Sequence, residues 1–231
     1  CNTEGFNRVA HLQSQPIVGG DLATYHPLRM AAGILYGEAD VAEWLMSKNS
    51  LLPHGETEAE LILKQLQKGN APTTSSCGRV LDAVSALLGI CYERTYEGEP
   101  AMKLESVAFT GKDYLDLVPK IKGTVLDTSY LVKEIFNKMN NYSVADLACS
   151  AQSYLGKGLG LLAVDQAEKL GVKHVGFSGG VAYNEHITDI MRKTVEGKGF
   201  KFLVHTRIPA GDGGTSFGQA VVVGLQNQNQ Q

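Results

Sequence analysis

Residues 173–184 read KHVGFSGGVAYN, and this stretch decides the fold class. Its first six residues predict a strand, and Gly179 and Gly180 predict the turn that ends it. A helix is expected after Asn184, and residues 200–204 predict a second strand. Because strands here alternate with helices, the sequence predicts an α/β architecture.

The pattern continues outward on both sides of this stretch. A loop over 208–214 precedes a helix expected to run to about residue 225. Three glycines inside one long expected helix suggest either close approach by another element or a break in the helix: Gly156, Gly158 and Gly160. Earlier helices are expected to begin where a capping residue or a proline precedes an apolar stripe, at Pro27, Thr57, Ser75 or Ser76, Pro100, Asp127 or Thr128, and Ser143.

Composition excludes several classes of protein. Lys and Arg total 21 and Asp and Glu total 24, so the net charge is −3, which argues against a nucleic-acid partner. Hydrophobic residues make up 43% and charged residues 19%, which excludes global disorder. The length of 231 residues suggests one large domain or two small ones. No apolar run approaches the ~18 residues of a membrane span, so no membrane partner is expected.

The chain's first residues and its cysteines bear on its location. The sequence begins with CNTEG, which lacks a signal peptide's basic and apolar regions and an initiator Met, so we expect a fragment or a processed piece. None of the four cysteines forms a Cys-x-x-Cys pair, so free thiols in a reducing compartment are expected. Both features predict a cytoplasmic protein.

Glycine-rich turns supply the first candidate site residues. Gly179 and Gly180 would let backbone amides approach a nucleotide, and Asn184 could contact its base or sugar; alternatively, Asn184 only caps the next helix. Asp212 could bind a divalent cation, or it could cap the last helix.

Two further candidates lie in the first third of the chain. The second double glycine, Gly19 and Gly20, is followed by Asp21, which could hold ribose hydroxyls or could be an ordinary turn residue. Ser76 and Arg79, at an expected helix start, could hold a phosphate or carboxylate; alternatively, they are a helix cap and a surface arginine.

Five motifs in order resemble one family. They are VGGD at 18–21 followed by PLRMA at 27–31, TSSCGRVLDAV at 74–84, YEGEPAM at 96–102, SGGV at 178–181 with Asn184, and DGG at 212–214 with Gly218 and Gln219. This series resembles HypF, the hydrogenase maturation carbamoyltransferase family. The resemblance implies the carbamoyltransferase branch of the actin-like ATPase, or ribonuclease H-like, superfamily, with the domain incomplete. It implies a strand region of the preceding subdomain at 1–25, the C-terminal part of the carbamoyltransferase domain at 26–225, and a polar tail at 226–231.

The resemblance also implies a reaction and its participants. Carbamate derived from carbamoyl phosphate would react with ATP to give carbamoyl-adenylate, and the carbamoyl group would pass to the C-terminal cysteine of a partner, HypE. A divalent metal would assist, with Mg, Zn and Fe left open. Related threonylcarbamoyl or O-carbamoyl transferases, and a scaffold that only docks a partner, remain alternatives.

Site residues are assigned from the matching motifs. The nucleotide would contact Gly19, Gly20, Asp21, Gly179, Gly180 and Asn184. Asp212 would bind the metal, and Ser76 and Arg79 would be catalytic residues that contact the substrate anion.

The chain departs from the family pattern in three respects. Leu28 replaces the family's Trp, residues 152–153 read QS in place of Phe-His, and the paired metal histidines that precede Gly-Gly-Asp do not occur. We therefore expect this chain alone to be inactive.

Overall fold

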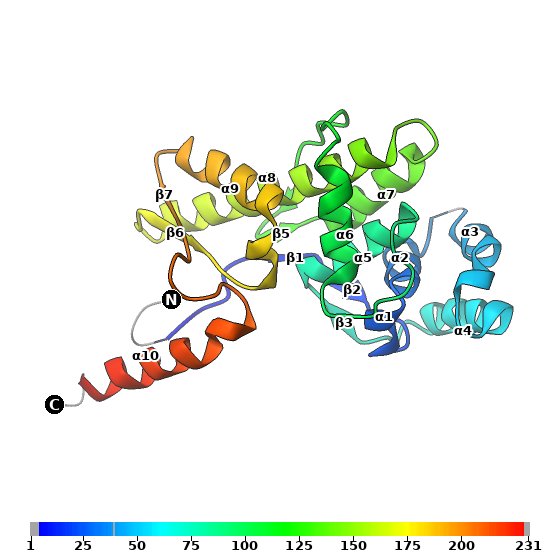
Figure 1. Ribbon diagram of the computed structural model, residues 1–231, viewed down its shortest axis with the longest axis horizontal. Coiled ribbons are helices and arrows are strands. Elements are labelled where there is room, and N and C mark those ends of the chain that lie inside the picture. Colours follow the sequence, from blue (N-terminus) through cyan, green and yellow to red (C-terminus); the bar gives the residue numbers. More distant parts are fainter. Residues whose placement is uncertain (1–4, 39, 229–231) are drawn as a thin grey trace. The chain divides into compact units, whose positions relative to one another are not determined.

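The computed structural model describes residues 5–38 and 40–228 (Figure 1). The chain divides into two compact units, a larger one of residues 12–155 and a smaller one of residues 1–11 and 156–231. The domain boundaries expected from the sequence, at residues 25 and 225, stay predictions. Residues 15–16 pair with residues 73–74 inside the larger unit.

The larger unit is mainly helical. Its helices are α1 (Leu22–Tyr25), α2 (Leu28–Leu35), α3 (Val41–Ser47), the 3-10 helix η1 (Asn49–Leu51), α4 (Gly55–Lys68), α5 (Cys77–Leu87), α6 (Glu99–Ala108), α7 (Thr128–Lys138) and the first half of α8 (Val144–Lys169). Its strands are β2 (Gln15–Pro16), β3 (Thr73–Thr74), β4 (Ile121–Lys122), β5 (Val125–Leu126) and the second residue of β1 (His11–Leu12), because the division falls after His11.

These strands form two small sheets. In the sheet of β1, β5 and β4, β5 lies in the middle and pairs antiparallel with β4. In the other, β2 and β3 are antiparallel, with Gln15 opposite Thr74 and Pro16 opposite Thr73. The register predicts that residues following β2 and residues following β3 leave the ladder at opposite ends.

Helix α2 is the centre of the larger unit's core. All of its residues are buried, and it begins directly after Pro27, whose fixed φ suits a helix start. Helix α5 packs against it (Figure 1) and buries an apolar stripe that includes Val80, Leu81 and Val84. Burial of this kind contributes roughly 2 kcal/mol for each large aliphatic side chain.

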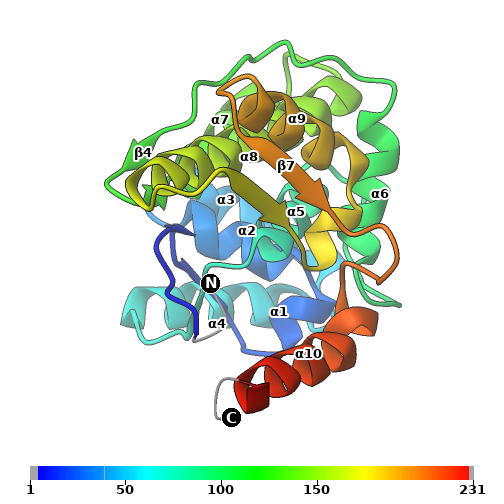
Figure 2. The ribbon, with the colours of Figure 1, turned by 90° about the vertical axis from the view of Figure 1, so that its left-hand side faces the viewer.

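The smaller unit contains the predicted strand–helix–strand. It consists of β6 (His174–Phe177), the 3-10 helix η2 (Gly180–Tyr183), α9 (Glu185–Glu196), β7 (Lys201–Val204), the 3-10 helix η3 (Asp212–Gly214), α10 (Thr215–Gln228) and the second half of α8. Strands β6 and β7 are parallel, with His174 opposite Lys201 (Figure 2). Helix α9 is amphipathic and buries Ile187, Met191 and Val195 at a spacing of four residues.

Two glycines of α8 explain how closely α9 packs on it. A Cβ at Gly156 would lie 2.9 Å from the Cβ of Ile190, and a Cβ at Gly160 would lie 2.9 Å from the Cβ of Thr194. The predicted close approach by another element is therefore confirmed at these two positions.

Most of the predicted helix starts are confirmed. Asp127 accepts a hydrogen bond from the Tyr130 N–H at 2.8 Å, and Ser143 accepts one from the Asp146 N–H at 3.1 Å. The start at Thr57 was wrong: α4 begins at Gly55.

The last helix and the cysteines complete the fold. Helix α10 continues to Gln228, into the expected polar tail, and residues 229–231 lie outside the described part of the chain. Cys77, Cys91 and Cys149 are free thiols, while Cys1 is not described.

Candidate functional site

The loop after β6 leaves open space beside its glycines. Gly179 has a φ of +96°, a conformation that glycine adopts without a steric penalty. Nothing lies within 4 Å of where a Cβ of Gly179 or of Gly180 would be. Gly180 is the first residue of η2, and the first turn of a helix leaves its N–H groups without an intrahelical acceptor. A ligand could therefore approach the backbone at Gly180.

A second loop, immediately before η3, is tied to the first. The carbonyl oxygen of Ala210 accepts hydrogen bonds from the Gly179 N–H at 2.8 Å and the Ser178 hydroxyl at 3.1 Å. The Gly211 N–H donates to the Tyr183 hydroxyl at 3.1 Å. These bonds bring the two glycine-rich motifs of the smaller unit together. They also occupy the Gly179 N–H, so of the two predicted amides that of Gly180 remains for a ligand.

A cavity of about 320 Å³ adjoins these loops within the smaller unit. Phe177, Tyr183, His205, Arg207 and Pro209 are among the residues that line it. His205 lies at the end of β7, with its Nε2 atom 3.0 Å from the Ser178 hydroxyl. The cavity lies beyond the carboxyl ends of two parallel strands, where open α/β sheets commonly bind ligands.

Asn184 has a structural role that the sequence analysis left as an alternative. It is buried at the N-cap of α9, and its side-chain oxygen accepts a hydrogen bond from the Ile187 N–H at 2.8 Å. This bond satisfies one of the open N–H groups of the helix. The amide NH2 of Asn184 and the second lone pair of its side-chain oxygen then remain for contact with a ligand.

Asp212 begins η3, in the loop tied to β6. Within the described part of the chain its carboxylate makes no hydrogen bond or ion pair, so it does not cap α10. No group of three His, Cys, Asp or Glu side chains among the described residues could hold a metal ion. Asp212 offers a single oxygen ligand, and the residues described do not by themselves fit a metal centre.

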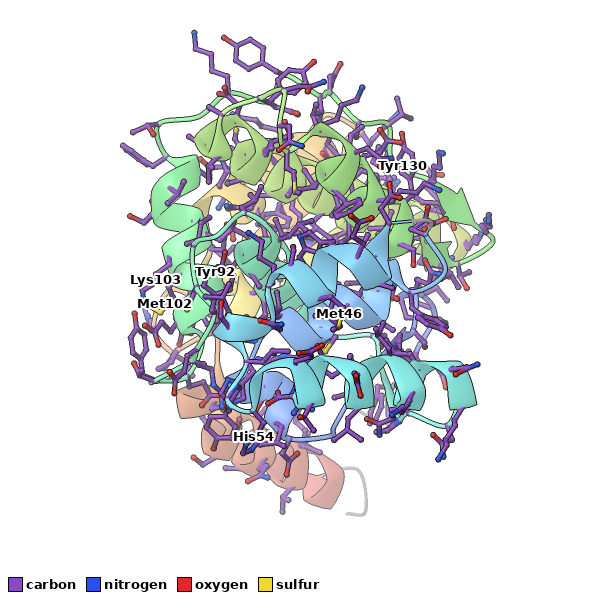
Figure 3. All side chains as sticks on the ribbon, turned by 90° about the vertical axis from the view of Figure 1, so that its right-hand side faces the viewer. Met46, His54, Tyr92, Met102, Lys103 and Tyr130 are labelled. Carbon is purple, nitrogen blue, oxygen red and sulfur yellow. The ribbon has the colours of Figure 1, made fainter. Side chains whose placement is uncertain are left out.

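In the other double glycine, a side chain of the larger unit fills the space beside Gly19. Gly19 has a φ of +84°, and a Cβ there would overlap Nη1 of Arg29. Arg29 is buried and pairs with Glu58, with Nη2 2.6 Å from Oε1, while its Nη1 donates to the Val18 carbonyl at 3.4 Å. Glu58 also accepts a hydrogen bond from the backbone N–H of His54, the residue before α4 (Figure 3). The loop around Gly19 is therefore fixed from within the larger unit.

The rest of that loop is open. Gly20 has a φ of +60° and nothing within 4 Å of a Cβ position. Asp21 is exposed at the N-cap of α1, where its side chain makes no capping hydrogen bond. Both residues are accessible to a ligand, and their contact with a nucleotide stays a prediction.

Ser76 and Arg79 differ from each other in environment. Ser76 is exposed at the N-cap of α5, and its side chain makes no capping bond. Arg79 instead contacts Asp82 one turn later, with Nη2 2.9 Å from Oδ2. The arginine is therefore not the free surface group that the alternative interpretation assumed. Because β2 and β3 are antiparallel, Ser76 and Gly19 also leave their ladder at opposite ends.

Asp82 is the functional candidate that sequence reasoning missed. It is 1% exposed, and burial raises the pKa of its carboxyl to about 6, although the nearby guanidinium groups of Arg79 and Arg94 oppose this shift. Neither carboxylate oxygen has a hydrogen-bond partner, so the 2.9 Å approach of Arg79 is an ion pair without hydrogen-bond alignment. An acid three residues after an arginine, on a helix with apolar neighbours, was the available signal.

Most of the chain is similar to known carbamoyltransferases. The family described as "Carbamoyltransferase, Kae1-like Domain, second subdomain" matches residues 1–219. A probable carbamoyltransferase HypF of Methanocaldococcus jannaschii is 44% identical over 95% of this chain, which covers 29% of that relative. Among the described residues, no helix is both long enough and apolar enough to cross a membrane.

Two solved structures show the same fold. The crystal structure of T. kodakarensis HypF matches 96% of this chain with a TM-score of 0.88 and 43% identity. Full-length HypF in a phosphate- and nucleotide-bound form matches with a TM-score of 0.84 and 26% identity, again over 96% of this chain. The chain covers 30% and 29% of these two proteins. The predicted fold, a partial domain of the carbamoyltransferase branch, is confirmed, and the chain belongs to the HypF carbamoyltransferase family, in which it matches the second subdomain of the Kae1-like domain.

Proposed function

We propose that this chain is the nucleotide-binding and carbamoyl-binding part of a protein that transfers a carbamoyl group at the expense of ATP. The observation that carries the proposal is the pair of tied loops in the smaller unit, where open space faces Gly180 and the unpaired carboxylate of Asp212 lies on the adjoining loop. The nucleotide-bound form of a full-length HypF, which has the same fold, supports it.

The proposed reaction has two steps. A carbamate oxygen attacks the α-phosphorus of ATP, the bond to the bridging oxygen breaks, and carbamoyl-adenylate and pyrophosphate form. The sulfur of the C-terminal cysteine of the partner HypE then attacks the carbamoyl carbon, AMP leaves, and the thiol proton is lost. The carbamoylated cysteine serves hydrogenase maturation.

The residues of this chain have separate parts in the proposal. The Gly180 N–H and the amide of Asn184 bind the nucleotide, and Gly20 and Asp21 remain candidates for it in the larger unit. Ser76 and Arg79 contact the carbamoyl donor. Asp212 as one ligand of Mg, Zn or Fe stays a prediction, and no step depends on it. Because Asp212 is the one candidate metal ligand that we propose among the described residues, this chain alone is expected to be inactive.

Carbamoyl-dependent exchange between ATP and pyrophosphate tests this function in the full-length protein. Gly180→Leu places a side chain in open space, at a residue whose φ is ordinary for any amino acid. The fold should therefore persist, while nucleotide binding should weaken at least tenfold. Gly224→Leu, at an equally open glycine of α10, is the matched control and should leave exchange unchanged.

Two results would overturn the proposal. A wild-type protein without exchange, given carbamoyl phosphate, the metal and the partner, excludes carbamoyl-adenylate formation. Full exchange and full maturation activity in Gly180→Leu would favour the alternative of a docking scaffold.

A further inference from the structure

The loop between β7 and η3 is fastened at both of its ends. His205, at the end of β7, lies with its Nε2 atom 3.0 Å from the Ser178 hydroxyl. Ala210, just before η3, accepts hydrogen bonds through its carbonyl oxygen from that hydroxyl at 3.1 Å and from the Gly179 N–H at 2.8 Å. The segment 205–210, which follows β7 in Figure 2, is therefore held against the residues that follow β6.

The contact with Ser178 also determines which nitrogen of His205 carries a proton. A serine hydroxyl has one proton to donate, and the hydroxyl of Ser178 donates it to the Ala210 carbonyl. Towards the imidazole ring this hydroxyl only accepts, so Nε2 of His205 carries a hydrogen and donates it. His205 is therefore a positioning residue that holds the loop.

Arg207 lies in the middle of the fastened loop and lines the cavity of about 320 Å³. Among the residues that the structure describes, its guanidinium has no hydrogen bond, ion pair or aromatic ring contact. No described Asp or Glu lines the cavity, and the carboxylate of Asp212 on the same loop lies outside its lining. The cavity therefore carries a positive charge that no side chain of the described residues neutralises.

The other polar groups of the cavity can also donate hydrogen bonds. The Tyr183 hydroxyl accepts from the Gly211 N–H at 3.1 Å and keeps its own proton for another partner. In the described part of the chain the Thr206 hydroxyl makes no hydrogen bond. The remaining walls are largely apolar and include Phe177 and Ile208. Donors around a positive charge favour an anionic ligand.

The shape of the guanidinium and the size of the cavity narrow the choice of anion. A guanidinium presents its N–H groups as a planar fork that matches two oxygens of a phosphate or a carboxylate. Pockets for small molecules measure roughly 300–1,000 Å³, so this cavity accepts a phosphate with part of the molecule that carries it. In the proposed reaction, ATP is the substrate with the most phosphate groups.

The cavity is also within reach of a nucleotide at Gly180. Gly180 is the first residue of η2, and Tyr183, which lines the cavity, is the last. Three steps of about 2 Å along a 3-10 helix separate them by roughly 6 Å. A nucleoside triphosphate is longer than this, so one molecule can contact both the Gly180 N–H and the cavity.

We propose that Arg207 binds a phosphate group of the nucleotide in this cavity, with its guanidinium donating to two phosphate oxygens. This inference rests on the proposed carbamoyl transfer at the expense of ATP, and it adds a residue that distinguishes a nucleotide from a nucleoside. Because the loop is already held in place by Ser178 and His205, binding has to order little more than the Arg207 side chain.

Calorimetric titration of the full-length protein with ATP and with adenosine, which lacks the phosphates, tests this role. Arg207→Gln removes the charge and the fork at an exposed position, so the fold should persist. We expect the Kd for ATP to rise at least tenfold, while the Kd for adenosine stays within twofold of wild type. If Arg207 only supported the fold of the loop, both constants would rise together.

Arg192→Gln is the matched control, because it removes the same charge from the same unit. The guanidinium of Arg192, on α9, lies 5.1 Å from the centre of the Phe202 ring and does not line the cavity. Both dissociation constants should stay within twofold of wild type in this variant.

A second substitution at the same position keeps the charge. Arg207→Lys retains the attraction for phosphate but loses the fork, so it should raise the Kd for ATP at least threefold, and by less than Arg207→Gln does. It decides the question if Arg207→Gln fails to fold.

Three results would overturn the inference. They are an unchanged Kd for ATP in the folded variant, an equal loss of adenosine affinity, and a raised KM for carbamoyl phosphate with an unchanged Kd for ATP. The last result would assign the cavity to the other phosphate-bearing substrate. In all three cases wild-type ATP–pyrophosphate exchange would still stand, whereas its absence would instead remove the proposed function.

Discussion

The two double glycines of this chain look alike in sequence but have different structural causes. At Gly19 the space that a side chain would need is filled by the guanidinium of Arg29, which is held by Glu58. At Gly179 and Gly180 nothing lies within 4 Å of a Cβ position. Gly19 is glycine because of the protein's own packing, whereas Gly179 and Gly180, like Gly20, leave room for a molecule from outside.

The comparison separates two meanings of a glycine-rich motif. A glycine required by internal packing should affect stability when it is changed, whereas a glycine that faces open space should affect binding. The four substitutions below measure this difference through urea unfolding of the full-length protein, from the largest expected effect to the smallest.

Gly19→Ala should have the largest effect. The new Cβ is strained by the positive φ and displaces Arg29 from a buried ion pair. We expect a loss of about 4 kcal/mol in the free energy of unfolding, since breaking a buried pair costs about 3–5 kcal/mol. A loss below about 1 kcal/mol would mean that the side chain of Arg29 moves aside freely, and the contrast between the two loops would then disappear.

Glu58→Gln disturbs the same loop from its other side. The neutral amide still accepts one hydrogen bond from Arg29 but removes its counter-charge, and a loss of about 2 kcal/mol is expected. The double variant Gly19→Ala/Glu58→Gln should lose less unfolding free energy than the two single variants lose together, because both substitutions act through Arg29. Strict additivity would show that the two positions are independent.

Gly179→Ala tests strain without a clash. Its φ of +96° disfavours a side chain, yet the space is open, so a loss of about 1 kcal/mol is expected. A loss as large as that of Gly19→Ala would indicate hidden packing at this loop.

Gly180→Ala should change stability least, within about 0.5 kcal/mol, because it adds a methyl group in open space. Its effect should appear in ATP affinity, measured by calorimetric titration of the full-length protein. Unchanged stability with unchanged affinity would mean that the nucleotide does not approach this residue.

Local signals account for what the sequence predicted well. The strand–turn–helix–strand from His174 to Val204 was predicted because its apolar runs and turn residues are adjacent in sequence. Asp127 and Ser143 were recognised as caps for the same reason, since each bonds an N–H three residues away.

Other features depend on residues distant in sequence and could not be predicted. The start of α4 was placed at Thr57, whereas the acceptor of the His54 N–H is Glu58, whose other oxygen pairs with Arg29. The pairing of β2 with β3 involves two residues on each strand, one of them a proline, which leaves no alternating pattern to detect.

The candidate site shows the same division. Gly180 and Asp212 were candidates from the sequence, because glycines and acids in expected loops can be identified from residue type alone. The sequence did not indicate Asp82, because burial and the absence of hydrogen-bond partners are properties of packing and not of residue type.

The contact between Arg29 and Gly19 also bears on how such motifs are weighed. Gly19 and Arg29, which belong to the same ordered motif series, depend on each other. The guanidinium of Arg29 fills the volume that a side chain at residue 19 would need. Because one packing contact requires both residues, a sequence that matches both positions of the motif gives little more support for the family than a sequence that matches one. Substitution at either position should succeed only when the other changes with it.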